Sequence, residues 1–335
     1  MAGQGQAPAR QAGFKGGLPK SAGAVTMSKM CGSGMRAAMF AHDMLLAGSA
    51  QVVVAGGMES MTNAPYLLPK ARGGYRIGHD RIFDHMMLDG LEDAYEPGRS
   101  MGTFGEDCAA KYSFTRAEQD AFATASVQRA KAATETGAFA AEIAPVTVKG
   151  RGGDTVISVD EGPGKVKLDK IPTLKPAFKK DGTITAASSS SINDGAAALV
   201  MMTAATAAQL GIKPLARIVS HAVHAQEPEW FATAPVGATR KALAKAGWSV
   251  ADVDLWEVNE AFAVVPMALM KDLNLSHEIV NVNGGACALG HPIGASGARI
   301  MVTLIHALKA RGLKKGLATL CIGGGEATAV ALELL

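Results

Sequence analysis

Residues 24–54 read AVTMSKMCGSGMRAAMFAHDMLLAGSAQVVV, and this stretch decides the fold class. The strand-like run 24–27 precedes a turn punctuated by glycines, where the backbone has unusual conformational freedom. Residues 35–46 carry apolar side chains at helical spacing, and Gly48 ends this predicted helix before a strand at 52–54. The stretch therefore predicts a strand–turn–helix–strand unit, which is the building block of α/β proteins.

The rest of the chain alternates in the same way beyond residue 183 and is less regular before it. From about 62 to 183 the sequence is rich in loops, so we expect an inserted loop subdomain there. Within it we expect helices at 101–112 and 115–133, the second of which starts with a capping box. Further elements are predicted at 196–202, 203–210, 216–225, 235–246, 254–258, 260–271, 280–282, 296–311, 316–321 and 328–334.

Composition limits the class of protein. The chain has 335 residues, of which 48% are hydrophobic and 19% charged, as expected for a globular protein with a large core. The net charge of +3 is small and its cations are scattered, so we expect no nucleic-acid partner. No apolar run is long enough to span a bilayer, so we expect no membrane partner. The four cysteines form no CxxC pair, which predicts no metal site and favours a reducing, cytoplasmic compartment.

Cys31 is the first candidate for chemistry. It lies at a turn that opens a helix, where unpaired N–H groups and the helix dipole stabilise a thiolate. Gly32 and Gly34 leave room for a ligand to approach the backbone. A cysteine packed as a small hydrophobic residue is the alternative, and the pattern around Cys31 alone leaves both open.

Three further features carry groups suited to catalysis. Asn259 follows a predicted strand, although a simple helix N-cap explains it equally well. His291 stands between glycine and proline in a glycine-rich loop, which suits a presented imidazole better than a packed one. Cys321 ends a strand ahead of three glycines, a turn whose exposed N–H groups can stabilise an oxyanion. Together with Cys31, these features indicate nucleophilic catalysis through a thiol.

The motifs that hold these residues occur in a fixed order, and together they resemble the thiolases of the acetyl-CoA acetyltransferase type over nearly the whole chain. They are KMCGSGM at 29–35, GGMESM at 56–61, NDGAA at 193–197, NEAF at 259–262, GHPIG at 290–294 and CIGGG at 321–325. The resemblance implies an α/β fold with a layered αβαβα architecture of two similar halves, 1–205 and 206–335. The first half would carry Cys31 and the insertion at about 62–183, and the second the other three catalytic motifs.

The resemblance also implies a difference at the front of the chain. Thiolases usually have a strand, a helix and another strand before the segment that matches residues 3–6. Since Met1 stands just ahead of this match, we expect the first half to lack an N-terminal βαβ unit and its sheet to have open edges.

The chemistry that the resemblance implies is a two-step acyl transfer. Cys31, kept as a thiolate by His291, attacks an acyl-CoA thioester and becomes acylated. Cys321 then removes the α-proton of a second acetyl-CoA, and the enolate attacks the acyl group to give a 3-ketoacyl-CoA; the reverse is thiolysis. His291 and a water held by Asn259 would stabilise the enolate. The N–H groups of Cys31 and Gly323 would stabilise the tetrahedral intermediate.

The resemblance further implies partners and binding residues. Ser190, Met101, Ala261 and Phe262 would contact the coenzyme A part of acetyl-CoA, 3-ketoacyl-CoA or free CoA, which are substrates, so no cofactor is expected. A homo-oligomer is implied, either a dimer or a dimer of dimers, with residues 72–95 as a contact. The activity belongs to fatty acid metabolism.

Two alternatives remain open at this point. A 3-ketoacyl synthase shares the fold and the nucleophilic cysteine, but it lacks a second cysteine such as Cys321. A shortened thiolase that has lost activity is the other alternative, since it would keep every motif. Ser100 stands where many short-chain thiolases have histidine, so the sequence does not fix the acyl chain length.

Overall fold

A four-stranded sheet forms the centre of the computed structural model, which describes residues 2–335. Its strand order is β7–β10–β9–β8, with β10 antiparallel to both neighbours and β8 parallel to β9. The bounds are Ala216–Ala225 for β7, Leu255–Val258 for β8, Lys315–Ile322 for β9 and Glu326–Leu334 for β10. The two central strands, β9 and β10, are buried on both faces, which explains their continuous apolar sequence.

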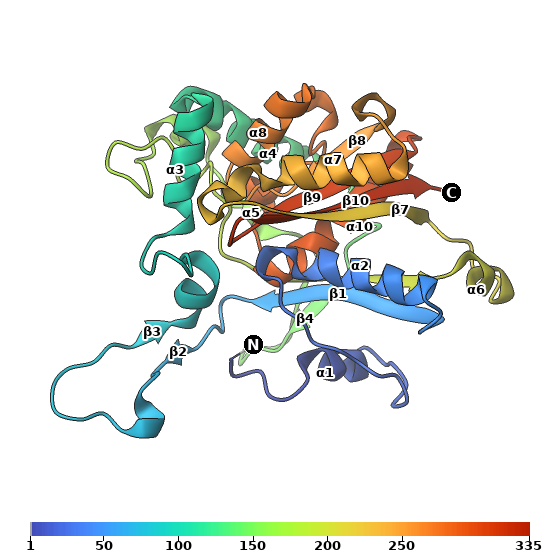
Figure 1. The fold of residues 1–335 in the computed structure, drawn as a ribbon, viewed down its shortest axis with the longest axis horizontal. Helices are drawn as coiled ribbons and strands as arrows, with labels where there is room; N and C mark the ends of the chain where they lie inside the picture. Colours follow the sequence, from blue (N-terminus) through green and yellow to red (C-terminus); the bar gives the residue numbers. More distant parts are fainter. Residues whose placement is uncertain (1) are drawn as a thin grey trace.

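A second sheet pairs β1 (Val52–Ser60) with β6 (Asp194–Met202) in antiparallel register. Helices α2 (Ser33–Leu46) and α10 (Ile293–Arg311) pack against this small sheet, and α10 also packs on β8 and β9. Figure 1 shows both helices as a layer between the two sheets. The core of this layer joins Met35 and Met39 of α2 to side chains of α10 and β9.

Glycines set how closely the central helices approach. A Cβ atom at Gly34 of α2 would lie 2.8 Å from the backbone nitrogen of Ala298 on α10. A Cβ at Gly297 of α10 would collide in turn with the backbone of Met35. Only glycine at these two positions lets the backbones pack together, and this brings the turn ahead of α2 onto the start of α10.

Outer helices complete the layers. Helix α7 (Ala234–Ala246) covers the far face of the large sheet, beside α8 (Val264–Leu273), and both contribute to a second core around Trp256. Helix α1 (Pro8–Lys15) lies beyond the small sheet (Figure 1). Short helices α6 (Ala204–Gln209) and α9 (Ala286–Leu289) connect larger elements. Within residues 2–335 no helix combines the length and the apolar composition needed to cross a bilayer.

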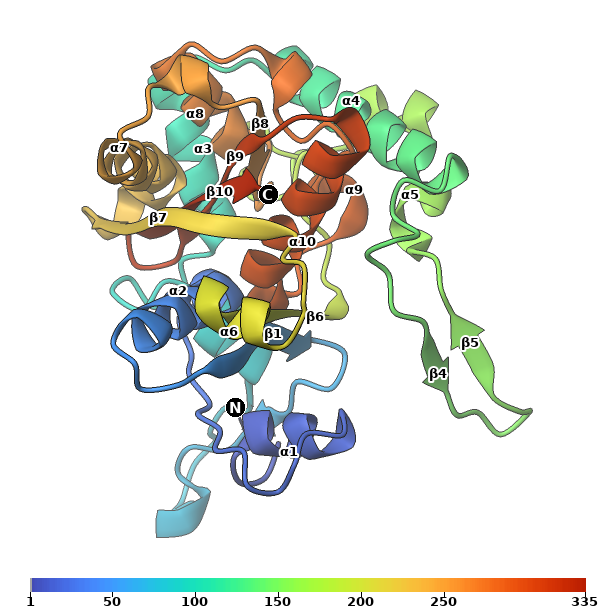
Figure 2. The same ribbon diagram turned by 90° about the vertical axis from the view of Figure 1, so that its right-hand side faces the viewer.

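The region from 61 to 183 contains two long helices and two projecting ribbons. The helices are α3 (Met101–Tyr112) and α4 (Arg116–Glu135), and a short α5 (Glu161–Lys165) follows. The ribbons pair β2 (Tyr66–Leu67) with β3 (Phe83–Asp84) and β4 (Val146–Val148) with β5 (Thr155–Ile157). Figure 1 shows the first ribbon and Figure 2 the second, each extending away from the layers. The predicted capping box is present, since the Thr115 hydroxyl accepts from the Glu118 N–H and the Glu118 carboxylate accepts from the Thr115 N–H.

The α/β prediction is confirmed, but three local predictions are wrong. No strand forms at 24–27, where the chain runs without ladder partners and the Thr26 hydroxyl accepts from the Ala9 N–H at 3.0 Å. Residues 280–282 make only a single bridge, between Val280 and Trp256. The helix expected from residue 260 begins at Val264, and its N-cap is Ala263, not Asn259. The intervening residues instead bond to the 188–191 loop, a tertiary contact that overrides the local helix signal.

Candidate active site

Cys31 occupies a strained turn at the junction of the two halves. It lies in the 3-10 turn Met30–Gly32, directly before α2. Met30 has φ 44°, a left-handed conformation that costs a residue other than glycine about 1–3 kcal/mol and is concentrated at functional sites. A side chain at Gly32 would collide with Ile322 at the end of β9. The turn therefore places Cys31 next to the end of β9, which carries Cys321 and is followed by Gly323.

The surroundings of Cys31 favour the neutral thiol. Burial raises its pKa from 9.0 to about 11. The N–H groups of Gly323 and Cys31 hydrogen-bond the sulfur and lower the pKa, but by less than burial raises it. The negative charge of Glu59 raises the pKa further. Desolvation thus opposes the thiolate expected from the helix end and from the resemblance, and that thiolate stays a prediction. The same two N–H groups are the ones expected to serve the tetrahedral intermediate, and the structure aims both at the reacting sulfur.

His291 is a buried neutral base with a defined tautomer. Burial, followed by the charge of Arg299, lowers its pKa to about 4. Its Nδ1 lies 2.5 Å from the hydroxyl of Ser296, and that hydroxyl donates its proton to the Pro292 carbonyl at 3.0 Å. When the hydroxyl proton goes to Pro292, the Ser296 oxygen accepts from His291, and we assign the ring proton to Nδ1 on this basis. The arrangement leaves Nε2 free to accept a proton.

Backbone contacts hold the His291 loop in place. Gly290 has φ 88°, and a Cβ there would collide with the side chain of Asn193. The N–H of His291 donates to the Ser191 carbonyl at 3.1 Å. The N–H of Gly294 donates to the Glu59 carboxylate at 2.9 Å. Three sequence motifs that lie far apart along the chain are thus joined around one imidazole.

Cys321 is a second thiol near the half-buried Cys31. It lies on β9, fully buried, where it pairs with Ala327 of β10. Burial raises its pKa well above 9.0, and the neighbouring Cys31 raises it again. Each thiolate would repel the other, so the pair favours at most one negative charge. Gly324 and Gly325, at φ 88° and 82°, form the turn that returns the chain into β10.

Asn259 presents an amide to the imidazole. It follows β8, where its N–H extends the ladder to the Thr319 carbonyl at 3.0 Å. Its Nδ2 lies 3.5 Å from both ring nitrogens of His291. Its Oδ1 is buried and has no hydrogen-bond partner among residues 2–335. A buried polar atom without a partner is costly, which marks Oδ1 as a position for a substrate or water hydrogen bond.

The four residues expected at coenzyme A lie on two adjoining segments and one helix end. The N–H of Ser190 donates to the Ala261 carbonyl at 3.0 Å. Phe262 is buried and packs edge-on against Phe178, with ring centroids 5.6 Å apart. Met101 begins α3, and its Cε lies 3.6 Å from the position of a Cβ built on Gly323. Met101 thus borders the nucleophile, while Ser190, Ala261 and Phe262 form a neighbouring wall.

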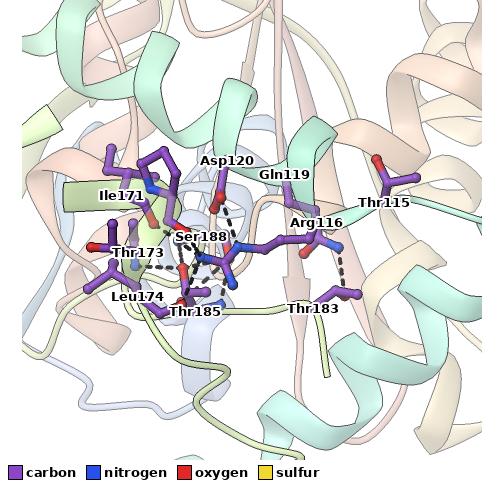
Figure 3. A network of polar contacts seen from close by, with 12 residues as sticks. Thr115, Arg116, Gln119, Asp120, Ile171, Thr173, Leu174, Thr183, Thr185 and Ser188 are labelled. Carbon is purple, nitrogen blue, oxygen red and sulfur yellow. Dashed lines mark hydrogen bonds and ion pairs between the residues drawn. The ribbon is translucent and has the colours of Figure 1, made fainter. Parts of the chain in front are cut away.

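A polar network under this wall fixes the segment that leads to Ser190. Figure 3 shows the Arg116 side chain reaching from α4 to the chain at 171–174. It pairs with Asp120 at 2.8 Å and donates to the carbonyls of Ile171 and Leu174 at 3.1 and 2.9 Å. Further along, the Thr185 N–H donates to the Ser188 hydroxyl at 2.9 Å. The loop that carries Ser190 is therefore anchored to a long capped helix.

Sequence reasoning missed three residues that support the site. Ser296 fixes the tautomer of His291, and Glu59 accepts from the same loop while facing Cys31. Glu260 is fully buried and accepts from Ser126 at 2.7 Å and from Asn281 at 2.8 Å. Glu59 and Glu260 lie inside recognised motifs, which was the available signal. Ser296 gave no signal beyond its spacing of five residues from His291.

Comparisons with known proteins agree with this site. Residues 1–205 match the model described as "Thiolase, N-terminal domain", and residues 212–334 match "Thiolase, C-terminal domain". An acetyl-CoA acetyltransferase of Chromobacterium violaceum is 53% identical over 99% of this chain and 85% of that protein. One of Rhizobium meliloti is 52% identical over 100% of this chain and 85% of that protein. The chain belongs to the thiolase family.

Solved structures show the same fold. The crystal structure of the Bacillus anthracis acetyl-CoA acetyltransferase has a TM-score of 0.96 and 43% identity, and this chain covers 85% of it. A thiolase from Ascaris suum in complex with coenzyme A has a TM-score of 0.93 and 42% identity, also with 85% covered. Both matches span 100% of this chain. The thiolase fold is confirmed, whereas the comparisons do not show the expected loss of an N-terminal segment.

The raised pKa of Cys31 has a measurable consequence. Since only the thiolate is alkylated, a thiol with a pKa of about 11 is about one part in a thousand reactive at pH 8. We expect the rate of Cys31 alkylation by iodoacetamide to rise about tenfold per pH unit from pH 7 to 10, with activity lost in parallel. Mass spectrometry of the Cys31 peptide measures this rate, and free cysteine is the control. A plateau near neutral pH would instead reveal a thiolate paired with imidazolium.

Proposed function

We propose that this chain catalyses the condensation of two acetyl-CoA molecules to acetoacetyl-CoA, and the reverse thiolysis of 3-ketoacyl-CoA, through an acyl group on Cys31. The observation that carries the proposal is the pairing of two thiols, the half-buried Cys31 and the fully buried Cys321, in a site that also holds the buried His291. One thiol can carry the acyl group while the other exchanges a proton with carbon. The curated relatives named acetyl-CoA acetyltransferase support this assignment.

In the first step the Cys31 sulfur attacks the thioester carbonyl while its proton passes to Nε2 of His291. The N–H groups of Cys31 and Gly323 stabilise the oxyanion that forms. Coenzyme A leaves with the proton of Cys321, so the acyl-enzyme holds one thiolate and one imidazolium. Opposite charges that form together offset the cost of burying either one alone.

In the second step the Cys321 thiolate removes a proton from the methyl group of a second acetyl-CoA. The enolate oxygen is stabilised by the imidazolium of His291 and by a water on Asn259, whose Oδ1 has no other partner among the described residues. The enolate carbon attacks the acyl group, and the departing Cys31 sulfur takes the proton back from His291. Both thiols and the imidazole return to their resting states, so every proton is accounted for.

Coenzyme A binds as a substrate in this proposal, and no resident cofactor takes part. Ser190, Ala261 and Phe262 hold its pantetheine end along the wall described above, and Met101 lies beside the thioester. A structural neighbour that was solved in complex with coenzyme A supports coenzyme A as a ligand. Self-association through residues 72–95 and a cytoplasmic location stay predictions, which sedimentation and cell fractionation would test.

A cleavage assay tests the function directly. The purified chain should convert acetoacetyl-CoA and CoA into two molecules of acetyl-CoA, with the loss of acetoacetyl-CoA followed by its absorbance and the product by chromatography. The kinetics should be ping-pong, because the acyl group rests on Cys31 between substrates. A folded chain that cleaves no acetoacetyl-CoA would support the inactive alternative and contradict the proposal.

A further inference from the structure

Three side chains of types that bind metals meet between α2 and the edge strand of the large sheet. His42 and Asp43 come from α2, and His221 comes from β7, the edge strand of the large sheet. Nε2 of His221 lies 3.2 Å from Nδ1 of His42 and 2.9 Å from Oδ1 of Asp43. The Nδ1 of His42 is also 3.3 Å from that oxygen. Two imidazole nitrogens and one carboxylate oxygen thus form a triangle, which matches one face of a tetrahedral ligand set.

The dimensions of this triangle match those of a zinc site. Ligand atoms at about 2.0–2.1 Å from a tetrahedral zinc ion lie about 3.3 Å apart, close to all three observed separations. We propose that His42, Asp43 and His221 bind one Zn²⁺ ion, with a water molecule as the fourth ligand. The proposal is independent of the acyl-transfer chemistry, because none of the three residues takes part in it.

The donor set selects the class of metal. Imidazole nitrogens favour zinc and its transition-metal neighbours, whereas magnesium and calcium prefer sites built from oxygen alone. The side chains of His42 and His221 are 22% and 13% exposed, and that of Asp43 is 51% exposed. The histidines are therefore held by packing, while the carboxylate side leaves an entry path and room for water.

The surrounding charges are mixed. Asp43 supplies one negative charge to the ion. The ammonium group of Lys245 donates to the His221 carbonyl at 3.0 Å, so one cation lies nearby and opposes binding. We accordingly expect a zinc affinity in the micromolar range and not the much tighter binding of a closed four-ligand site.

The position of the cluster indicates a structural role. His42 lies nine residues beyond Ser33, which is about 13 Å along the helix axis. The ion would therefore tie the far half of the nucleophile helix to the edge of the large sheet without touching Cys31. Removing it should lower the thermal stability and leave acetoacetyl-CoA cleavage within about twofold.

Zinc titration of the full chain tests the site. After chelator treatment and alkylation of accessible thiols, calorimetry should show one Zn²⁺ per chain, and X-ray absorption should show nitrogen and oxygen neighbours without sulfur. The melting temperature should rise by about 5 °C at a zinc concentration about 100-fold above Kd. The variant His42→Asn with His221→Asn should bind at least 100-fold more weakly and show no such rise. His306→Asn, on α10 and outside the cluster, should behave as the unaltered chain does.

Several outcomes would overturn the site. Unchanged zinc binding by the double variant would place the ion elsewhere, and sulfur neighbours would place it at the thiols. Absence of any zinc binding by the unaltered chain would also overturn it. Circular dichroism without zinc checks that the double variant folds. If the double variant does not fold, the variant Asp43→Asn tests the site, because the half-exposed side chain of Asp43 tolerates the change. Its zinc affinity should fall at least tenfold. An unchanged zinc affinity would contradict the proposal.

Discussion

Replacing Cys31 with serine should lower the rate of acetoacetyl-CoA cleavage by about 10⁴-fold or more, the range found when a covalent nucleophile is removed. Serine keeps the shape of the side chain and the hydrogen bonds from Gly323 and Cys31, so the fold should be preserved. Its hydroxyl, however, is much less acidic than a thiol, and neutral His291 is a weak base with a pKa of about 4. The attacking oxygen would therefore not lose its proton.

The measurement combines kinetics with detection of the intermediate. Incubation with acetyl-CoA should leave one acetyl group per chain on the unaltered protein, located at Cys31 by peptide mass spectrometry, and none on Cys31→Ser. Cys287→Ala is the matched control, since Cys287 is also buried and free but lies on α9 outside the proposed chemistry. Activity of Cys31→Ser within tenfold of the unaltered chain would exclude Cys31 as the acyl carrier.

Local patterns were enough to predict most of the fold. The helices at 33–46 and 101–112 and the strands at 216–225 and 326–334 follow apolar spacing and end at glycine or polar residues, which are short-range signals. Residues 24–27 have a similar strand-like sequence, but no neighbouring strand pairs with them. Pairing depends on residues far along the chain, which a local pattern does not contain.

The sequence indicated which residues belong to the candidate site, but it did not indicate how burial shifts their pKa values. Glycines that follow Cys31 and flank the loop of His291 indicated exposed reactive groups, whereas the structure leaves Cys31 half-buried and His291 buried. The sequence predicted a thiolate from the helix end, and the resemblance predicted one from His291. The structure shows that desolvation dominates, and burial is a property of the whole packed layer of α2, α10 and β9. A short sequence motif does not contain the tertiary packing that shifts these pKa values.

Replacing Cys321 with serine should separate the two steps of the reaction. The proposed role of Cys321 is proton exchange, and removing a general acid or base typically costs about 10²–10⁴-fold. Condensation and thiolysis should therefore fall by about that factor. Acetylation of Cys31 by acetyl-CoA should still reach one group per chain, although more slowly, because the leaving coenzyme A loses its proton donor but can be protonated by water.

Proton exchange gives the sharpest evidence. In D₂O the unaltered chain should exchange the methyl protons of acetyl-CoA, whereas Cys321→Ser should exchange them at least 100-fold more slowly while still carrying an acetyl group on Cys31. Cys31→Ser forms no acetyl-enzyme, and the two variants therefore fail at different steps. Cys287→Ala should retain both exchange and acetylation. Undiminished methyl exchange by Cys321→Ser would mean that another group, with His291 the nearest alternative, takes the carbon-bound proton. Cys321 would then serve only as a packing residue beside Cys31, fully buried on β9 opposite Ala327 of β10.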